Sequence, residues 1–378
     1  MARKKNLERA VVLGLLLSTS VYSSAWADVV LIEGENAYPE GLRIQGVTET
    51  YSGEGRNITI NAHNDSIWLG ASLGIWSLGT SVADGNGTIN VGSLNIDVRN
   101  YIGDDLHVQD EISAGILAGP ERVDSSWQGN DSHNAIVTLN SDNDVNISAL
   151  TRNGKSSYGI YSKTKGDVNV SSNNGSITIN ASKGLSSSKY DDGMLIHKYY
   201  IKDADYANSQ AYGLNAENGK IILSADNNIS ISAFIKDDRD LSGYDNYENY
   251  NNALQVSDIY AVSNTNGTID LSTGNENENG GIISLSATAN KGNAYGLYTK
   301  NGVKNSINNA AKFIITAKST DGKAYGIYAD NDKNNEYNNL TNYIHAESDS
   351  GEAYGIYAIN GSQIDIIATG TDENGYGN

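Results

Sequence analysis

The chain has 378 residues, with 26 Lys and Arg against 45 Asp and Glu, and a formal net charge of -19. This balance argues against nucleic acid and anionic lipid as partners, because both are recognised by a basic face. The chain contains no Cys, which excludes a disulfide framework and thiolate metal sites.

Residues 1–27 have the three parts of a secretory signal peptide. Arg3-Lys4-Lys5 supplies a basic region, the run from Ala10 to Leu17 is apolar, and Ala25-Trp26-Ala27 forms an A-x-A site before Asp28. The apolar run is too short to be a membrane anchor. We therefore predict a mature chain from Asp28. Because residues 1–27 carry a net charge of +3, its net charge is near -22.

Residues 28–150 contain short segments of alternating apolar and polar residues, which predict β-strands with one buried face. They are Ile58–Ile60, Ile89–Val91, Leu94–Val98 and Val145–Ile147. We interpret residues 28–150 as an N-terminal cap and divergent first rungs of a repeat that is clearer downstream. The terminal repeats of a solenoid are usually atypical, because they must cover an open end.

Residues 151–378 carry a repeated phrase built around Tyr-Gly. It reads Ala294-Tyr295-Gly296-Leu297-Tyr298, and Ala324–Ala329 and Ala353–Ala358 repeat it at spacings of 30 and 29 residues. Looser copies begin at Tyr158, Tyr212 and Tyr260, and worn copies are Leu73–Trp76 and Ala114–Leu117. Self-similarity at a period of a few tens of residues predicts a repeat architecture.

The phrase predicts a strand with one buried face. Alternation places Tyr325, Ile327 and Ala329 inward and Gly326 and Tyr328 outward. A second kind of strand follows the phrase after a turn, as in Gly175–Ala181, Gly267–Leu271 and Gln363–Ala368. The corners are Asn-Gly, Asp-Gly and Asn-Asn pairs, which tolerate a left-handed backbone. Together these features predict an all-β fold, a parallel β-helix (β-solenoid).

The interval between copies lengthens to 54 residues before Tyr212 and to 48 before Tyr260, which suggests double rungs with added loops. We predict loop insertions near 185–209 and 236–252. Such insertions often form the binding face of a solenoid, and tyrosine suits recognition surfaces. The alternative is that they are merely tolerated surface loops. The predicted binding residues are Tyr190, Tyr199, Tyr200, Tyr206, Tyr244, Tyr247 and Tyr250.

Motifs for catalysis and metal binding are weak. Gly70–Gly74 matches G-x-S-x-G, but its neighbours predict strands rather than the strand-to-helix turn that a nucleophile elbow needs. Asp330–Asn334 begins like a calcium loop and then lacks the required Gly and Glu, so we interpret it as a polar corner. We predict no catalytic residues, no metal site and no cofactor. A polysaccharide-cutting β-helix stays an alternative, with candidate carboxylate pairs Asp104/Asp105, Asp191/Asp192 and Asp237/Asp238.

The signal peptide, the Asn/Gly/Ser/Thr-rich strands and the repeated Ala-Tyr-Gly-Ile-Tyr-Ala phrase resemble the autotransporter passengers of type V secretion in Gram-negative bacteria. The resemblance implies a right-handed parallel β-helix at the cell surface, commonly acting as an adhesin. It also implies a C-terminal outer-membrane translocator barrel, whose alternating strands this chain does not contain. We therefore expect the chain to be the N-terminal part of a longer protein.

These observations predict a non-catalytic surface passenger that binds a protein or glycan on a host cell or a neighbouring bacterium. The expected partners are that ligand, the translocator barrel, and further copies of the chain through exposed rung edges. A structural stalk without a ligand of its own is the alternative within the same class.

Overall fold

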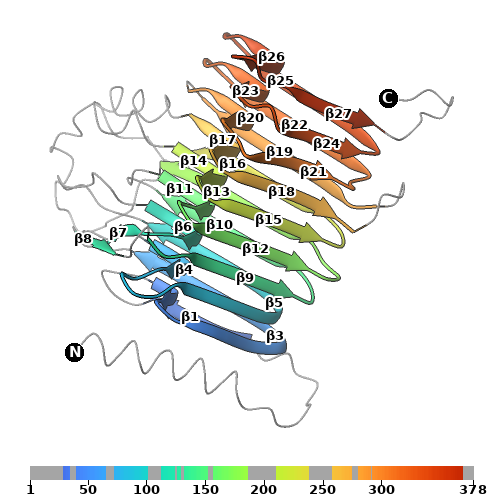
Figure 1. The fold of residues 1–378 in the computed structure, drawn as a ribbon. Helices are drawn as coiled ribbons and strands as arrows, with labels where there is room; N and C mark the ends of the chain where they lie inside the picture. The colour runs from blue at the N-terminus through green and yellow to red at the C-terminus, as the bar shows by residue number, and fades with distance from the viewer. Residues whose placement is uncertain are drawn as a thin grey trace.

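The computed structural model describes residues 29–34, 40–64, 72–100, 112–123, 126–128, 132–151, 156–185, 210–237, 258–274, 280–290 and 292–368. The predicted signal peptide lies outside this part of the chain. Within it there is no helix, and all strands pair in parallel except β7 (Glu121–Val123) and β8 (Ser126–Gln128), which form an antiparallel pair. The strands lie in stacked sheets that run the length of the molecule (Figure 1).

The Tyr-Gly phrase forms a sheet of its own with nine strands, which we call the phrase sheet. Identical residues of successive copies pair with each other; for example, Tyr295 pairs with Tyr325 and Tyr325 with Tyr354. The worn copies Leu73–Trp76 and Ala114–Leu117 belong to this sheet as predicted. Its strands are β2 (Glu40–Gln45), β4 (Ser72–Leu78), β6 (Ile112–Ala118), β11 (Ser156–Ser162), β14 (Gln210–Glu217), β17 (Ile259–Thr265), β20 (Ala294–Lys300), β23 (Ala324–Asp330) and β26 (Ala353–Ile359).

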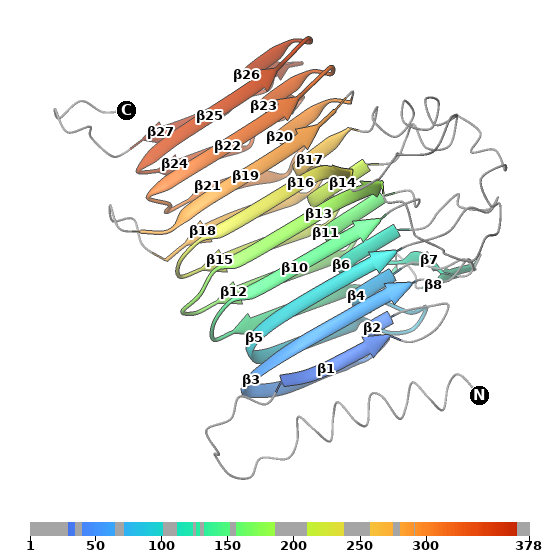
Figure 2. The ribbon, with the colours of Figure 1, turned by 180° about the vertical axis from the view of Figure 1, so that it is seen from behind.

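The larger, 16-stranded sheet bends along β3 (Thr48–Asn64) and β5 (Gly85–Asn100), because β5 pairs with β9 through its first half and with β10 through its second half. The first wall contains β9 (Ala135–Ser141), β12 (Gly166–Ser172), β15 (Lys220–Ala225), β18 (Thr268–Thr273), β21 (Lys304–Asn308), β24 (Asn335–Asn339) and β27 (Ile364–Ala368). The second wall, seen in Figure 2, contains β1 (Val29–Gly34), β10 (Val145–Thr151), β13 (Ile177–Leu185), β16 (Ile229–Asp237), β19 (Ile282–Ala289), β22 (Lys312–Ser319) and β25 (Thr341–Ser348).

One rung is therefore a phrase strand, then a first-wall strand, then a second-wall strand, as in β20, β21 and β22. This is the β-solenoid arrangement that the repeat predicted. The sequence had suggested one kind of strand after the phrase, but Gly175–Ala181 enters the second wall and Gly267–Leu271 the first. The predicted double rungs are wrong, because β11–β13 and β14–β16 are single rungs. The extra length falls in 186–209 and 238–257, outside the described residues.

The interior is a continuous core of Ile, Leu, Val and Ala from the phrase sheet and both walls. Side chains of one type stack in columns, since parallel in-register pairing repeats each position from rung to rung. On the second wall, for example, Ile179 pairs with Ile231, Ile231 with Leu285, and Leu285 with Ile315. Burial of these columns supplies the main driving force for folding.

The glycine of the phrase faces this core. A Cβ on Gly326 would lie 2.5 Å from Cγ2 of Ile344, and pairing between neighbouring strands skips the glycine, joining Tyr325 to Tyr354 and Ile327 to Ile356. Glycine and the following aliphatic residue thus both point inward, and the alternation shifts by one residue at this point. The inward placement of Ile327 and Ala329 is confirmed, as is the outward placement of Tyr328. The inward placement of Tyr325 and the outward placement of Gly326 are wrong.

Asparagine makes most of the left-handed corners, as the sequence predicted. Among the described residues other than glycine, positive φ angles occur at Lys165, Asn218, Asn266, Asn301, Asn309, Asn331 and Asn360. Asparagine tolerates this backbone conformation better than most residues, because its short polar side chain bonds locally.

Candidate binding surface

A column of stacked tyrosines runs along the outer face of the phrase sheet. Successive rings are nearly parallel and their centroids lie 4.7 to 5.3 Å apart. This spacing follows from the distance of about 4.8 Å between paired strands. The column consists of Tyr158, Tyr212, Tyr260, Tyr295, Tyr325 and Tyr354.

A second column, Tyr298, Tyr328 and Tyr357, lies three residues further along the last three phrase strands. Its rings stack on one another at 5.2 and 5.4 Å, and they meet the first column edge to face. Tyr325 and Tyr328, for example, are 5.2 Å apart with an interplanar angle of 86°. Such pairs contribute about 0.5–1.5 kcal/mol each beyond their burial. The buried tyrosines of the first column therefore support the second column in an ordered arrangement.

The first column also carries a row of hydrogen bonds. The residue two positions before each tyrosine points to the same face of the strand. The hydroxyl of Tyr260 donates to Oδ2 of Asp258 at 3.5 Å, and that of Tyr212 donates to Oε1 of Gln210. Burial raises the pKa of the Tyr260 phenol, and the charge of Asp258 raises it further. The phenols thus stay protonated near neutral pH and can act as hydrogen-bond donors and acceptors.

The outer face changes character along the solenoid. In the rungs of β4 and β6 the two tyrosine positions hold Leu73, Trp76, Ala114 and Leu117, all of them fully buried. Trp76 satisfies its indole nitrogen by donating to the carbonyl of Gly119 at 2.9 Å. In β20 and β23, by contrast, the second tyrosine of the phrase is only half-buried. The accessible part of the tyrosine columns therefore lies toward the C-terminal rungs.

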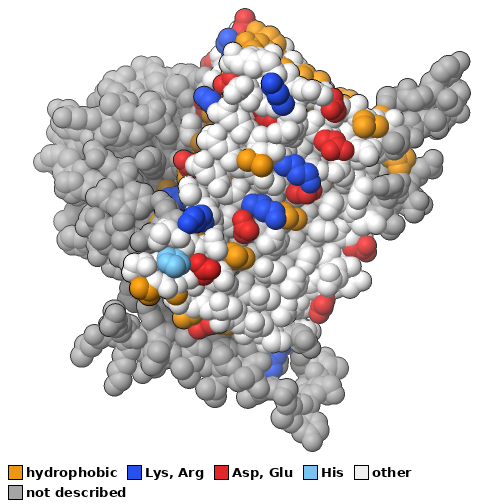
Figure 3. Space-filling view, in the orientation of Figure 1, with side chains coloured by type: hydrophobic (Ala, Val, Ile, Leu, Met, Phe, Trp, Pro, Cys, Tyr) orange, Lys and Arg blue, Asp and Glu red, His pale blue; other side chains and the backbone are white. Residues whose placement is uncertain are grey.

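Charges beside the accessible tyrosines are paired. Lys323 lies 2.6 Å from Glu352 and Lys300 lies 3.6 Å from Asp330, in each case across neighbouring rungs. The first wall, which faces the viewer in Figure 3, shows mostly uncharged polar side chains and backbone with scattered acidic and basic side chains, among them the ion pair of Lys304 and Asp270 at 2.7 Å. Tyr260, Tyr295 and Tyr325 of the first column are buried, so the accessible aromatic surface is provided mainly by the half-buried second column.

The tyrosines predicted to bind, Tyr190, Tyr199, Tyr200, Tyr206, Tyr244, Tyr247 and Tyr250, all lie outside the described residues. The strands that flank their segments are described. β13 ends at Leu185 before β14, and β16 ends at Asp237 before β17. In both cases the described strands end on the second wall and resume on the phrase sheet, at the same corner of the rung.

The tyrosine columns were missed by the sequence analysis, although their signal was present. Tyr295 and Tyr298 stand three residues apart, as do Tyr325 and Tyr328, and strict alternation would have put them on opposite faces. The inward glycine between them restores a common face. Only the strand pairing around that glycine reveals this shift.

The serine of the Gly70–Gly74 segment, for which no catalytic role was predicted, lies on a strand of the phrase sheet. Ser72 is fully buried on β4 and donates to the carbonyl of Arg99 at 3.2 Å. The carboxylates Asp104, Asp105, Asp191, Asp192 and Asp238 lie outside the described residues, as does the side chain of Asp237. Within the described ranges, no group of three or more His, Cys, Asp or Glu side chains could hold a metal ion. No helix long and apolar enough to span a membrane occurs in the described part of the chain.

The calcium-like segment is a polar corner, as predicted. Asp332 is fully buried between β23 and β24, and its carboxylate accepts from the amides of Gly302 (3.0 Å) and Asn334 (3.0 Å) and from Nδ2 of Asn305 (2.9 Å). Asn305 in turn donates to Oδ1 of Asn335 at 2.9 Å. These neutral donors satisfy the carboxylate, so the corner ties neighbouring rungs together.

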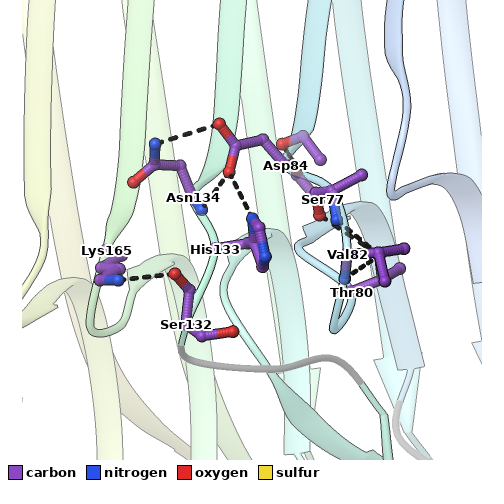
Figure 4. Close-up of polar contacts among 10 residues, drawn as sticks. Ser77, Thr80, Val82, Asp84, Ser132, His133, Asn134 and Lys165 are labelled. Atoms are coloured by element: carbon purple, nitrogen blue, oxygen red, sulfur yellow. Dashed lines mark hydrogen bonds and ion pairs between the residues drawn. The ribbon is translucent and has the colours of Figure 1, made fainter.

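A second polar corner ties the rung of β4 to that of β6 (Figure 4). The carboxylate of Asp84 accepts from the backbone amide of Asn134 at 2.9 Å and from its side chain at 3.2 Å, and lies 3.2 Å from Nδ1 of His133. The Asn134 amide holds the pKa of Asp84 below its ordinary value. Asp84 and His133 are half-buried, and no hydroxyl among the described residues is hydrogen-bonded to His133, so we interpret the group as a structural contact.

Comparison of the chain with protein-family models, with curated proteins and with solved structures finds no match. Its function must therefore be argued from its own residues.

Proposed function

We propose that the chain is the passenger of an autotransporter, exported by the signal peptide 1–27 and displayed on a bacterial surface, where it adheres to a protein or glycan without catalysis. The N-terminal A-x-A site and the repeated phrase support export and a solenoid passenger. The outer-membrane translocator barrel belongs to the same proposal. So does the right-handed sense of the coil, which steric preference favours for crossovers between parallel strands.

The observation that carries the adhesive role is the pair of tyrosine columns. A binding surface needs contact area that is already ordered, because ordering side chains at the moment of binding costs affinity. Tyr298 and Tyr328 stack on each other and both make edge-to-face contacts with Tyr295, so little ordering remains. Their hydroxyls add hydrogen-bonding capacity, and tyrosine is among the residues that dominate binding energy at interfaces.

The test uses beads coated with residues 28–378, offered to cultured epithelial cells and to bacteria that display the same chain. The variant replaces Tyr298, Tyr328 and Tyr357 by Ser, the residue that stands at the same position in β17 as Ser263. Loss of interface anchors predicts about tenfold weaker adhesion, which corresponds to ~1.4 kcal/mol.

The matched control is Tyr343→Ser, which removes a tyrosine that is 58% exposed on a different surface, the second wall. It should leave adhesion unchanged. Equal loss in both variants would show that the columns are not the binding surface. A wild-type chain that adheres to neither cell type would favour the structural stalk.

A further inference from the structure

Lys183 occupies an inward position at the end of β13. Ile177, Ile179 and Ala181 precede it at alternate positions and belong to the core. In the neighbouring rungs the same position of the second wall holds Thr151 on one side and Ile235 on the other. Further along the second wall, the last inward positions hold Ala289 and Ser319. The lysine thus replaces neutral side chains at this position.

Among the described residues the amine of Lys183 has no hydrogen-bond partner, and the residue is only 1% exposed. The nearest polar position in register, Thr151, uses its hydroxyl elsewhere: it lies 2.8 Å from Oγ of Ser113 and 3.2 Å from the carbonyl of Ser156. A buried ammonium without a partner is costly, and a lysine in this position gives up its proton instead.

In the part of the chain that the structure describes, no ionisable side chain forms a hydrogen bond or an ion pair with the amine of Lys183. β10 carries none. On β16, Lys236 and Asp237 are in register with Gly184 and Leu185 instead. The ionisable residues of the other elements packed against β13 are Tyr158 and Tyr161 on β11, Tyr212 and Glu217 on β14, and Lys220 on β15. Glu217 accepts from the hydroxyl of Tyr161 at 2.5 Å.

We propose that protonation of Lys183 opens the second wall at the end of β13. When the amine takes up a proton, Ser182–Leu185 separates from β10 and β16. The neutral amine fits the closed wall, beside Thr151 and Ile235. The ammonium fits only the open wall, where it reaches water.

The direction of the pH dependence follows from linkage. Burial lowers the pKa of Lys183 from 10.5 to about 7 in the closed wall. Between these values the open state holds a proton that the closed state lacks, so the opening constant rises about tenfold for each pH unit of acidification. Below about pH 7 both states are protonated and the opening constant levels off.

The experiment is amide hydrogen exchange on residues 28–378 at pH 7, 8 and 9, with the intrinsic pH dependence of exchange removed. In the wild type, opening of Ser182–Leu185 should increase about tenfold from pH 9 to 8 and about fivefold from pH 8 to 7. Lys183→Thr, which copies Thr151 from the rung before, should abolish this slope. The matched control Lys220→Thr, which copies Thr268 from the next rung of the first wall, should keep it.

A slope that is absent from the wild type, or that persists in Lys183→Thr, would overturn the proposal. A second measurement covers the case in which the variant does not fold. The ¹³Cε resonance of Lys183 in the wild type should titrate near pH 7, and titration near the ordinary value of 10.5 would equally overturn the proposal.

Discussion

The column of phrase glycines makes a specific prediction about packing, which we develop for Gly296. A Cβ on Gly296 would lie 2.2 Å from Cγ2 of Ile315 and 2.7 Å from the carbonyl oxygen of Gly326. The glycine before it in the column, Gly213, would likewise meet Cγ2 of an isoleucine, Ile231. Between these two rungs, β17 has Ala261 at the glycine position, and the paired core residue is Leu285.

Leucine explains the exception, because it carries no Cγ2 branch at Cβ. An alanine methyl can then occupy space that the isoleucine branch fills in other rungs. For Gly296→Ala, the methyl must move about 1.5 Å from Ile315 to reach ordinary contact. Overpacking of this kind costs about 1–3 kcal/mol. Adding Ile315→Leu should recover part of this loss, with a favourable coupling of about 0.5–2 kcal/mol.

The assay is urea unfolding of residues 28–378, comparing midpoints at unchanged slope. The reverse double-mutant cycle, in the rung of β17, serves as control. Leu285→Ile alone should destabilise the chain, and adding Ala261→Gly should restore part of the lost stability. Purely additive effects in both cycles would refute the argument that the Cγ2 branch selects glycine.

Three further predictions concern polar groups. Asp332→Asn turns a donor toward Asn305 and should cost about 1–3 kcal/mol in urea unfolding, whereas a neutral result would contradict the role of the corner. Since the pKa of Asp84 is lowered from 3.8, the stabilisation that it gives is present above this value and is lost as the pH falls through the folded-state value. As the pH falls through the folded-state pKa of Asp84, hydrogen exchange of the Asn134 amide, corrected for its intrinsic rate, should become faster in the wild type but not in Asp84→Asn. Because burial raises the pKa of Tyr260, Tyr260→Phe should leave the tyrosinate absorbance below about pH 11 unchanged.

Much of the fold could be predicted from the sequence, because the same pattern of alternating apolar and polar residues between polar corners recurs in many repeats. The alternation in Ile177 and Ile179 predicted a strand with one buried face, and the Asn-Gly pairs predicted left-handed corners. Parallel stacking follows once identical phrases recur, since like residues then pair in register.

The candidate surface could not be predicted so well, because it depends on a local exception to that rule. The inward glycine shifts the alternation by one residue, and this shift decides whether Tyr325 joins the core or the outer column. The unpaired amine of Lys183 depends on what stands beside it in two other rungs, which lie more than 30 residues away in sequence. Because Thr151 and Ile235 are distant from Lys183 in the sequence, the sequence alone does not show that these residues are neighbours.

The asparagine corners have a consequence for how the protein ages. In an Asn-Gly pair, the glycine nitrogen can attack the side-chain carbonyl of asparagine and expel ammonia, and hydrolysis of the cyclic imide gives mainly isoaspartate, which lengthens the backbone by one carbon. Gly267 donates its amide to Oδ1 of Asn264 at 2.9 Å, and Gly302 donates to Asp332 at 3.0 Å, so neither nitrogen is free to attack while the rung is closed. The cyclised intermediate would also have to form at Asn266 and Asn301 within a backbone already held at positive φ. Folding thus protects the corners at Asn266 and Asn301 against a reaction to which Asn-Gly pairs are prone.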